Sequence, residues 1–239
     1  MTAAARLETA AAADPRLIVP LDLPDLDQAR AMVEALGEAV SFYKVGLELF
    51  ASGGMTLARD LKAQGKQVFL DWKLHDIGTT VQRSAAVLAD SGCDFLTVHG
   101  EPQVMAAAVR GRGRSDLKIL AVTVLTSLSD EDLLEMGFTE SARSLVERRI
   151  HHAVAAGCDG VIASPHEAQL ARAIGGPDFL VVTPGVRPDW AARNDQARAA
   201  TPAQALGAGA SHIVCGRPIT GANDPQAAAL RIVAEMAGA

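Results

Sequence analysis

The 239-residue sequence predicts an α/β protein, a closed parallel (β/α)8 barrel of the TIM type, and three observations support this prediction. Short apolar segments typical of buried strands alternate eight times with helical patterns along the chain. Barrels of this kind run to roughly 250 residues as a single domain, close to the length of this chain. The Gly-x-Gly-x-x-Gly signature of a dinucleotide-binding fold is missing after the first strand, which disfavours an open doubly wound sheet.

The expected strands are apolar runs bounded by polar residues, glycine or proline. Continuous apolar runs are typical of parallel strands that are buried on both faces of the sheet. The third strand begins at residue 67 and leads into a polar segment at residues 70–80. The other strands are expected at residues 16–23, 41–47, 94–99, 117–126, 160–163, 179–183 and 212–215.

Helix start and stop signals separate these strands. Pro24-Asp25 opens the first helix and Gly37 ends it, while Asp224 before Pro225 is expected to cap the last helix. Helices are expected at residues 25–35, 55–63, 81–89 and 102–109, in the segment 130–157 as a short helix, a loop and a longer helix from residue 142, and after residues 165, 202 and 225.

Composition and charge exclude several classes of function. The net charge is −6 and no run of Lys and Arg occurs, so a nucleic acid is not an expected partner. No apolar run approaches the roughly 18 residues of a membrane span. Cys93, Cys158 and Cys215 are scattered in apolar contexts, which fits a reducing, cytoplasmic compartment better than disulfides or a metal site.

Residues 1–14 are Ala-rich and are expected to be a frayed extension, with residues 15–239 forming a single catalytic barrel domain.

The most polar segment is Asp71-Trp72-Lys73-Leu74-His75-Asp76, at the end of the third strand. Four ionisable residues in six positions are costly to desolvate unless they neutralise one another. Alternation along a strand places Asp71, Lys73 and His75 on one face, with Asp76 on the other face or in the turn beyond. Trp72 is then expected to face away from the cavity. A carboxylate beside an ammonium group at a strand end is typical of barrel enzymes, although a structural ion pair is the alternative.

Further polar residues and a glycine fall at the carboxyl ends of other strands, where barrel active sites form. These are Asp22, Lys44, Thr126, Ser127, Arg187, Gly216 and Arg217. Barrels often bind phosphate in the loops after the seventh and eighth strands. Gly185 and Gly216 would let the backbone approach an anion closely, and Arg217 supplies a permanently charged, planar group. These two loops therefore predict a phosphate site, unless the glycines serve tight turns alone.

From Asp22 to Pro218 the chain resembles the orotidine 5′-phosphate decarboxylase family. The resemblance rests on the pattern Asp-x-Lys-x-x-Asp-Ile at residues 71–77. Four further motifs occur in the expected order: Phe42-Tyr43-Lys44-Val45-Gly46, Val124-Leu125-Thr126-Ser127, Pro184-Gly185-Val186-Arg187-Pro188 and Gly216-Arg217-Pro218-Ile219. Gly78-Thr79 stand where the family usually has Pro-Asn, so a looser turn is expected there.

The resemblance implies decarboxylation of orotidine 5′-monophosphate to UMP in pyrimidine biosynthesis, by a cytoplasmic homodimer that uses no metal and no cofactor. It implies that Lys73 protonates C6 of the pyrimidine and that Asp71 lies against the substrate carboxylate. Lys44 would hold Asp71 and a ribose hydroxyl, completing with Asp76 a neutral tetrad. The other implied contacts are Asp76 and Thr80 with the ribose in the partner subunit's site, Asp22 with ribose, Thr126 and Ser127 with the pyrimidine, and Arg187, Gln196, Gly216 and Arg217 with phosphate.

Two other functions stay open. A magnesium-dependent sugar-phosphate lyase, such as a 3-keto-gulonate-6-phosphate decarboxylase or a hexulose-phosphate synthase, shares the Asp-x-Lys-x-x-Asp pattern but uses it to bind magnesium and an enediolate. A non-catalytic barrel that senses a phosphorylated ligand is the other. Thr126-Ser127 and His75-Asp76-Ile77 argue against the lyase, and the presence of both Lys44 and Lys73 argues against the sensor.

Overall fold

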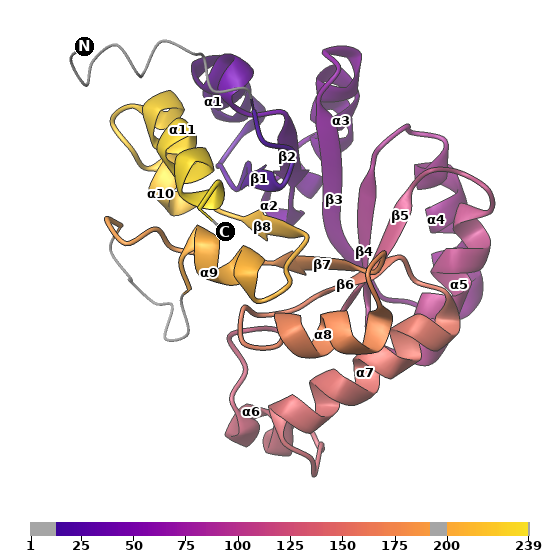
Figure 1. Ribbon diagram of the computed structural model, residues 1–239. Helices are drawn as coiled ribbons and strands as arrows, with labels where there is room; N and C mark the ends of the chain where they lie inside the picture. Colours follow the sequence, from indigo (N-terminus) through magenta and orange to yellow (C-terminus); the bar gives the residue numbers. More distant parts are fainter. Residues whose placement is uncertain (1–12, 192–199, 239) are drawn as a thin grey trace.

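The computed structural model describes residues 13–191 and 200–238, and within them eight strands form a closed barrel (Figure 1). Each strand pairs in parallel with the next, and β8 closes the barrel by pairing with β1. The predicted closed parallel barrel is therefore confirmed. The strands are β1 (Leu17–Pro20), β2 (Phe42–Val45), β3 (Gln67–Leu74), β4 (Phe95–His99), β5 (Lys118–Val122), β6 (Gly160–Ile162), β7 (Leu180–Thr183) and β8 (His212–Val214).

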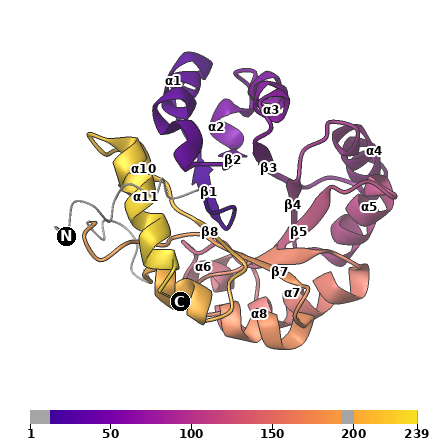
Figure 2. The same cartoon turned by 45° about the horizontal axis from the view of Figure 1, so that its top comes forward.

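Helices surround the strands on the outside of the barrel (Figure 2). The helices are α1 (Leu26–Leu36), the 3₁₀ helix η2 (Gly37–Ala39), α2 (Leu47–Phe50), α3 (Gly54–Ala63), α4 (Gly78–Ala89), α5 (Pro102–Arg112), α6 (Asp130–Glu135), α7 (Ala142–Ala156), α8 (Ala168–Gly175), α9 (Pro202–Gly207), α10 (Arg217–Thr220) and α11 (Pro225–Met236). None of those in the described part of the chain combines the length and hydrophobicity that crossing a bilayer requires.

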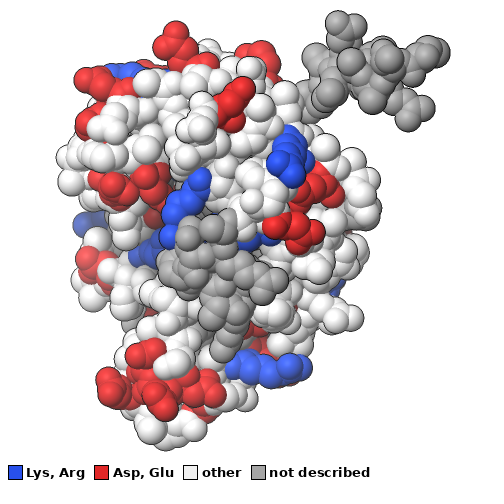
Figure 3. Space-filling model, turned by 90° about the vertical axis from the view of Figure 1, so that its left-hand side faces the viewer, with Lys and Arg blue, Asp and Glu red and all other residues white. Residues whose placement is uncertain are grey.

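Cap residues start helices where the sequence predicts. The Asp25 carboxylate accepts the Gln28 N–H at 2.8 Å and so caps α1, and Asp224 caps α11 through the Ala227 N–H at 2.9 Å. Figure 3 shows acidic side chains gathered at the lower end of the molecule, where α6 lies in Figure 1. Asp130, Glu131 and Asp132 occupy the first turn of α6, where negative charge interacts favourably with the helix dipole.

Several predicted boundaries are wrong. The fifth strand ends at Val122 and not at residue 126, so Thr126 lies in the following turn. Helix α4 begins at Gly78, three residues before the predicted start. Its N-cap residue is Ile77, which makes no side-chain capping hydrogen bond, so no polar cap residue marks this start in the sequence. The one-turn helices α2 and α10 were not predicted, since a single turn is too short to show helical periodicity.

The start of the folded chain also differs from the prediction. Residues 1–12 of the predicted frayed extension lie outside the described residues. Asp14, which the prediction included in that extension, forms an ion pair with Arg16 at 2.7 Å, and its carbonyl accepts the Leu17 N–H. Asp14 therefore packs with the barrel domain.

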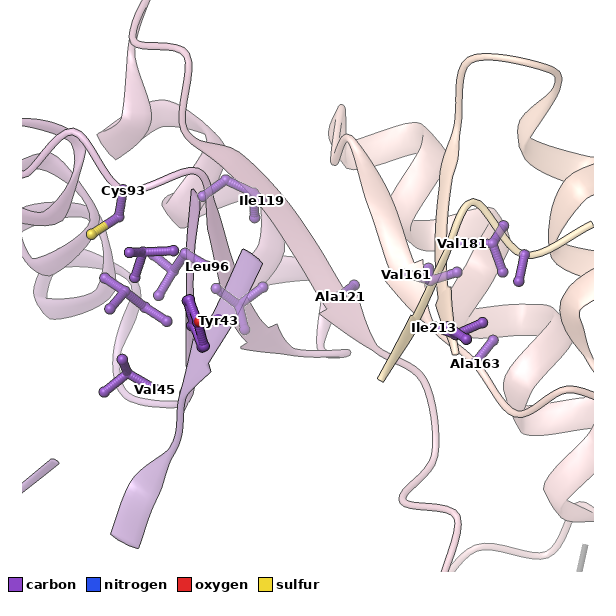
Figure 4. Close-up of a cluster of buried hydrophobic side chains, with 14 of the residues drawn as sticks. Tyr43, Val45, Cys93, Leu96, Ile119, Ala121, Val161, Ala163, Val181 and Ile213 are labelled. Carbon is purple, nitrogen blue, oxygen red and sulfur yellow. The ribbon is translucent and has the colours of Figure 1, made fainter. Parts of the chain in front are cut away.

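The hydrophobic core has two parts because successive strand residues point to opposite faces. Outward residues, among them Tyr43, Leu96, Val161 and Ile213, belong to the large cluster beneath the helices (Figure 4). Inward residues form a second cluster that fills the lower barrel: Ile18, Phe42, Phe69, Phe95, Leu120, Val182 and Val214. This second cluster is the floor on which the polar residues above it rest.

The cysteines belong to the core. Cys93, Cys158 and Cys215 are all buried free thiols, which confirms that they act as small hydrophobic residues. Burial raises the pKa of the Cys158 and Cys215 thiols to about 12, so both remain protonated and unreactive near neutral pH.

Candidate active site

A chain of alternating charges lies at the carboxyl ends of β1, β2 and β3. Lys44 Nζ is 2.9 Å from Asp22 Oδ1 and 3.4 Å from Asp71 Oδ2, and Lys73 Nζ is 2.9 Å from Asp71 Oδ1. Two carboxylates and two ammonium groups make the chain neutral, so its members compensate one another as they leave water. The structure thus brings together three of the four predicted catalytic residues and adds Asp22 to them.

Asp71 lies at the centre of this chain and is the most strongly held carboxylate in it. Burial by itself raises the pKa of Asp71, but the ammonium groups of Lys44 and Lys73 and hydrogen bonds from Lys73 and Thr97 outweigh burial and lower that pKa below its usual value. Asp71 is therefore ionised at neutral pH. A fixed negative charge and a fixed positive charge, on Lys73, stand side by side at the mouth of the barrel.

Two adjoining cavities meet at this charged chain. One, of about 300 Å³, is lined by Asp22, Arg187, Gly216, Arg217 and Thr220; the other, of about 200 Å³, is lined by Lys73, Val122, Val124, Leu125 and Thr126. Lys44, Asp71, Pro184 and Val214 border both. A larger cavity of about 580 Å³ lies between α1 and α3 and contains none of the predicted site residues. The polar groups therefore converge on the two smaller cavities.

The first cavity has the features expected of an anion site. Arg187 is buried with 7% of its surface exposed, and its Nη1 donates to the Val186 carbonyl at 3.0 Å. Gly185 has a φ of 76°, a conformation that favours glycine. A Cβ on Gly216 would lie 2.8 Å from the Pro20 ring, so Gly216, the N-cap residue of α10, lets the chain after β8 pass close to β1. Gln196, predicted to bind phosphate, lies outside the described residues.

The second cavity is mainly apolar and suits a flat ring. Phe69, Val122, Val124 and Ile162 line it together with Lys73. Thr126 lines it as predicted, whereas Ser127 is exposed and is absent from the described lining of either cavity. The predicted contact of Ser127 with a ligand in this cavity therefore lacks support within one chain.

Asp76 does not join the charged chain. It is exposed, and its Oδ1 accepts the N–H of Ile77 at 2.6 Å. The predicted tetrad takes Asp76 from the partner subunit, so one chain holds only Lys44, Asp71 and Lys73 of it, with Asp22 beside Lys44. Thr80 is likewise exposed, on the first turn of α4.

Of the two side chains near Lys73 whose directions were predicted, Trp72 points as expected and His75 does not. Trp72 packs edge-on against Phe50 of α2 with ring centroids 4.8 Å apart, which confirms that it points away from the cavity. His75 was predicted to share the face of Asp71 and Lys73. It instead lies past the end of β3. Its ring stacks on that of His99 with centroids 4.6 Å apart, and its Nε2 is 3.7 Å from Glu101 Oε2. Strand alternation fails there because the strand has ended.

Sequence reasoning missed two residues of this site. Thr97 on β4 is fully buried, and its hydroxyl donates to Asp71 Oδ1 at 2.9 Å. The available signal was its position two residues after Phe95 on the inward face of β4. Gly46 lies directly against the charged chain, because a Cβ there would lie 2.6 Å from Asp22 Oδ1 and 2.8 Å from Lys44 Nζ and would displace these groups.

Comparisons with known proteins agree with this geometry. Orotidine 5′-phosphate decarboxylase of Caulobacter sp. (strain K31) is 74% identical over 226 residues, which cover 95% of this chain and 99% of the relative. The enzyme of the same name from Rhodopseudomonas palustris is 56% identical over 224 residues, 94% of each chain. A crystal structure of orotidine 5′-phosphate decarboxylase from Lactobacillus acidophilus superposes with a TM-score of 0.82 at 40% identity, covering 93% of this chain and 99% of that one.

A family model adds the extent of the match. The model described as "Orotidine 5′-phosphate decarboxylase / HUMPS family" matches residues 15–232, which include every strand of the barrel and both cavities. The motif residues that carried the resemblance all lie inside this match. The chain belongs to the orotidine 5′-phosphate decarboxylase / HUMPS family.

Proposed function

We propose that this chain is a carboxy-lyase that converts orotidine 5′-monophosphate to UMP and carbon dioxide in pyrimidine biosynthesis, with no metal and no cofactor. The observation that carries the proposal is the chain Asp22–Lys44–Asp71–Lys73 at the junction of an anion-binding cavity and an apolar one. Residues 15–239 would act as one catalytic domain, and the three free thiols agree with a cytoplasmic location.

The two cavities suggest how the substrate is held. Its phosphate would lie by Arg187, Gly216 and Arg217, where two guanidinium groups supply charge-assisted hydrogen bonds. Lys44, which borders both cavities, and Asp22, which lines the first, would bind ribose hydroxyls. The pyrimidine would enter the apolar cavity beside Thr126, with C6 directed toward Lys73. Binding energy from the phosphate, remote from C6, would then help to hold the reacting ring in place.

The chemistry would follow from the fixed charges. Asp71 beside the substrate carboxylate would disfavour that negative charge, and the C6–carboxyl bond would break with its electron pair remaining on C6. The ammonium group of Lys73 would stabilise the developing carbanion without reorganising. Its proton would pass to C6 to give UMP, and the neutral amine would regain a proton from solvent.

The decisive experiment is a spectrophotometric assay with orotidine 5′-monophosphate, after dialysis of the enzyme against EDTA. We expect rapid conversion to UMP, with no change when magnesium is restored. Conversion only with magnesium, or none at all from folded enzyme, would contradict the proposal. An intact ligand after long incubation would instead indicate a non-catalytic sensor of phosphorylated ligands.

The second candidate is a magnesium-dependent sugar-phosphate lyase, because such enzymes share the Asp-x-Lys-x-x-Asp pattern found at residues 71–76. In this structure Lys73 and Thr97 occupy one oxygen of Asp71 and Lys44 lies by the other. A cation would have to displace at least one ammonium group to reach that carboxylate. This arrangement favours the first proposal, and the EDTA assay distinguishes the two.

Lys73→Ala separates catalysis from binding. We expect turnover to be abolished, while UMP, which needs no proton from Lys73, still binds through its phosphate with an affinity within about tenfold of the unchanged enzyme. Isothermal titration with UMP and a circular dichroism spectrum would measure the two properties. Loss of UMP binding together with the fold would contradict this division of roles.

We further propose a homodimer in which Asp76 and Thr80 contact the ribose in the partner subunit's site. Large apolar side chains are exposed beside them: Ile77 at 70%, Leu47 at 57% and Phe50 at 53%. The last two belong to α2, which contacts β3, so the three lie near the carboxyl ends of β2 and β3. A second copy of the chain would remove this apolar surface from water.

Mixing two inactive variants tests whether sites are shared. In a dimer of Lys73→Ala with Asp76→Ala, one site has neither residue and the other has both. Random mixing of the subunits should therefore restore about a quarter of the activity of the unchanged enzyme. No recovery from a mixture that has exchanged subunits would contradict the placement of Asp76, and a monomer in sedimentation would contradict the dimer.

A further inference from the structure

Lys73 has an unusual backbone conformation. Among the described residues it is the only one other than glycine with a positive φ, at 48°. The pairing of β3 with β4 is regular at Leu70 and then shifts register before Leu74, so Lys73 lies within a bulge. A side chain with a Cβ rarely adopts the left-handed region, and such residues persist only where their surroundings hold them.

Thr97 of β4 supplies that hold through a single hydroxyl. Its Oγ1 accepts the N–H of Lys73 at 3.0 Å and donates to Asp71 Oδ1 at 2.9 Å. The same Asp71 oxygen accepts from Lys73 Nζ at 2.9 Å. The hydroxyl, the carboxylate and the two ends of Lys73 thus form a closed ring of hydrogen bonds. In regular parallel pairing a backbone carbonyl accepts such an N–H; at the bulge the Thr97 side chain does so.

We infer that Thr97 is a positioning residue, whose hydroxyl keeps Lys73 in the left-handed conformation that directs its ammonium group to Asp71 and the apolar cavity. Thr97 is fully buried and does not line either cavity, so it acts through Lys73 and Asp71. Without the hydroxyl, the part-buried N–H of Lys73 would lose its acceptor and Lys73 would relax toward an extended conformation. The inference rests on the proposed role of Lys73 as the proton donor.

The test compares Thr97→Val, which keeps the shape but removes the hydroxyl, with Thr97→Ser, which keeps the hydroxyl. The matched control is Thr123→Val on the adjacent strand end, because Thr123 is equally buried and donates to the Ile162 carbonyl at 2.9 Å without touching the charged chain. The probes are orotidine 5′-monophosphate for kcat and KM, UMP, and a UMP analogue with an anionic oxygen at C6, which imitates the carbanion.

For Thr97→Val we expect kcat to fall about 10²-fold, because a small misplacement of a catalytic group costs about this factor. KM and the affinity for UMP should stay within about threefold, while the affinity for the C6-anion analogue should fall in proportion to kcat. Thr97→Ser should restore kcat to within about threefold, and Thr123→Val should leave it unchanged. If Thr97→Val does not fold, Thr97→Ala removes the hydroxyl without placing a methyl group against Asp71.

Three outcomes would overturn the inference: an unchanged kcat in the hydroxyl-free variants, an equal loss of UMP and analogue affinity, or an equal effect of Thr123→Val. The variant Lys73→Ala distinguishes a wrong role for Thr97 from a wrong role for Lys73 in the proposed function. If Lys73→Ala is inactive and Thr97→Val is fully active, the role of Thr97 alone is contradicted. If Lys73→Ala retains turnover, the role of Lys73 is itself contradicted.

Discussion

Strands β2, β3 and β4 contribute to both the floor and the mouth of the barrel, yet the two regions differ in almost every property. Phe42, Phe69 and Phe95 pack in the floor, with ring centroids 4.9 Å apart for Phe42 and Phe95 and 5.9 Å apart for Phe69 and Phe95. Two residues further along each strand, Lys44, Asp71 and Thr97 form the polar mouth.

This difference shows how a barrel separates stability from function. Aromatic burial in the floor contributes free energy of folding and keeps the strands at fixed distances. The mouth gathers groups that are costly to desolvate and are held only by one another. We therefore expect substitutions of floor residues that line neither cavity, such as Phe95, to change stability with little effect on turnover, and substitutions in the mouth to do the reverse.

Among the substitutions matched to a control elsewhere in the chain, Lys44→Met in the mouth should have the largest effect. Removing this ammonium group leaves Asp22 and Asp71 without their shared partner, and kcat/KM should fall about 10³-fold or more. Lys66→Met is the matched control, since Lys66 is an equally buried lysine whose Nζ donates to the Gly37 and Val40 carbonyls. It should lose about 1–3 kcal/mol of stability and keep its kcat/KM. Equal kinetic effects of the two variants would refute the comparison.

Phe95→Ala in the floor should have the opposite signature. Phe95 contacts the rings of Phe42, Phe69 and His212, so its truncation should lower the free energy of unfolding by about 3–5 kcal/mol. Urea titration measures this loss, and Phe95→Leu should show roughly half of it. The kcat of folded protein should stay within about twofold. A large fall in kcat at full folding would mean that floor and mouth are coupled.

The floor should also make stability depend on pH, through His212. Burial lowers the pKa of His212 to about 4, from an ordinary value near 6.5. Because the unfolded chain takes up this proton first, the stabilisation is fully present above about pH 6.5 and is lost as the pH falls toward 4, by about 3 kcal/mol in total. Denaturant titrations of His212→Gln at several pH values should lack this part of the pH dependence. The control His166→Gln, at an exposed position, should keep this pH dependence. Identical stability-against-pH curves for the unchanged enzyme and His212→Gln would refute the assignment to His212.

The smallest expected effect is that of Gly46→Ala. The added Cβ would meet the ends of two side chains, Asp22 and Lys44, which can move aside at little cost to the fold. Stability should change by less than about 1 kcal/mol, while kcat/KM should fall about tenfold because the charged chain is displaced. In Gly207→Ala the Cβ meets no atom within 4 Å, so neither quantity should fall. Steady-state kinetics and thermal unfolding of both variants provide the comparison.

Much of the candidate site could be predicted because position along a strand carries information. Lys44, Asp71 and Lys73 were placed correctly from polar residues at the ends of apolar runs. Thr97 was not, because a threonine between Leu96 and Val98 looks like an ordinary strand residue. Asp76 was assigned to the partner subunit's site from the family resemblance, and within one chain it lies past the end of β3 at Leu74, apart from the charged residues.

The sequence by itself determined the order of the elements, the barrel class and the strand ends that carry charge, since each depends on local hydrophobic patterns and residue types. The tertiary structure decided that Asp22 joins the charged chain within one subunit, that β3 bulges at Lys73, and that a hydroxyl from β4 holds it there. These features depend on the register between neighbouring strands, which brings together residues 22 to 26 positions apart, and no pattern within a single strand encodes it.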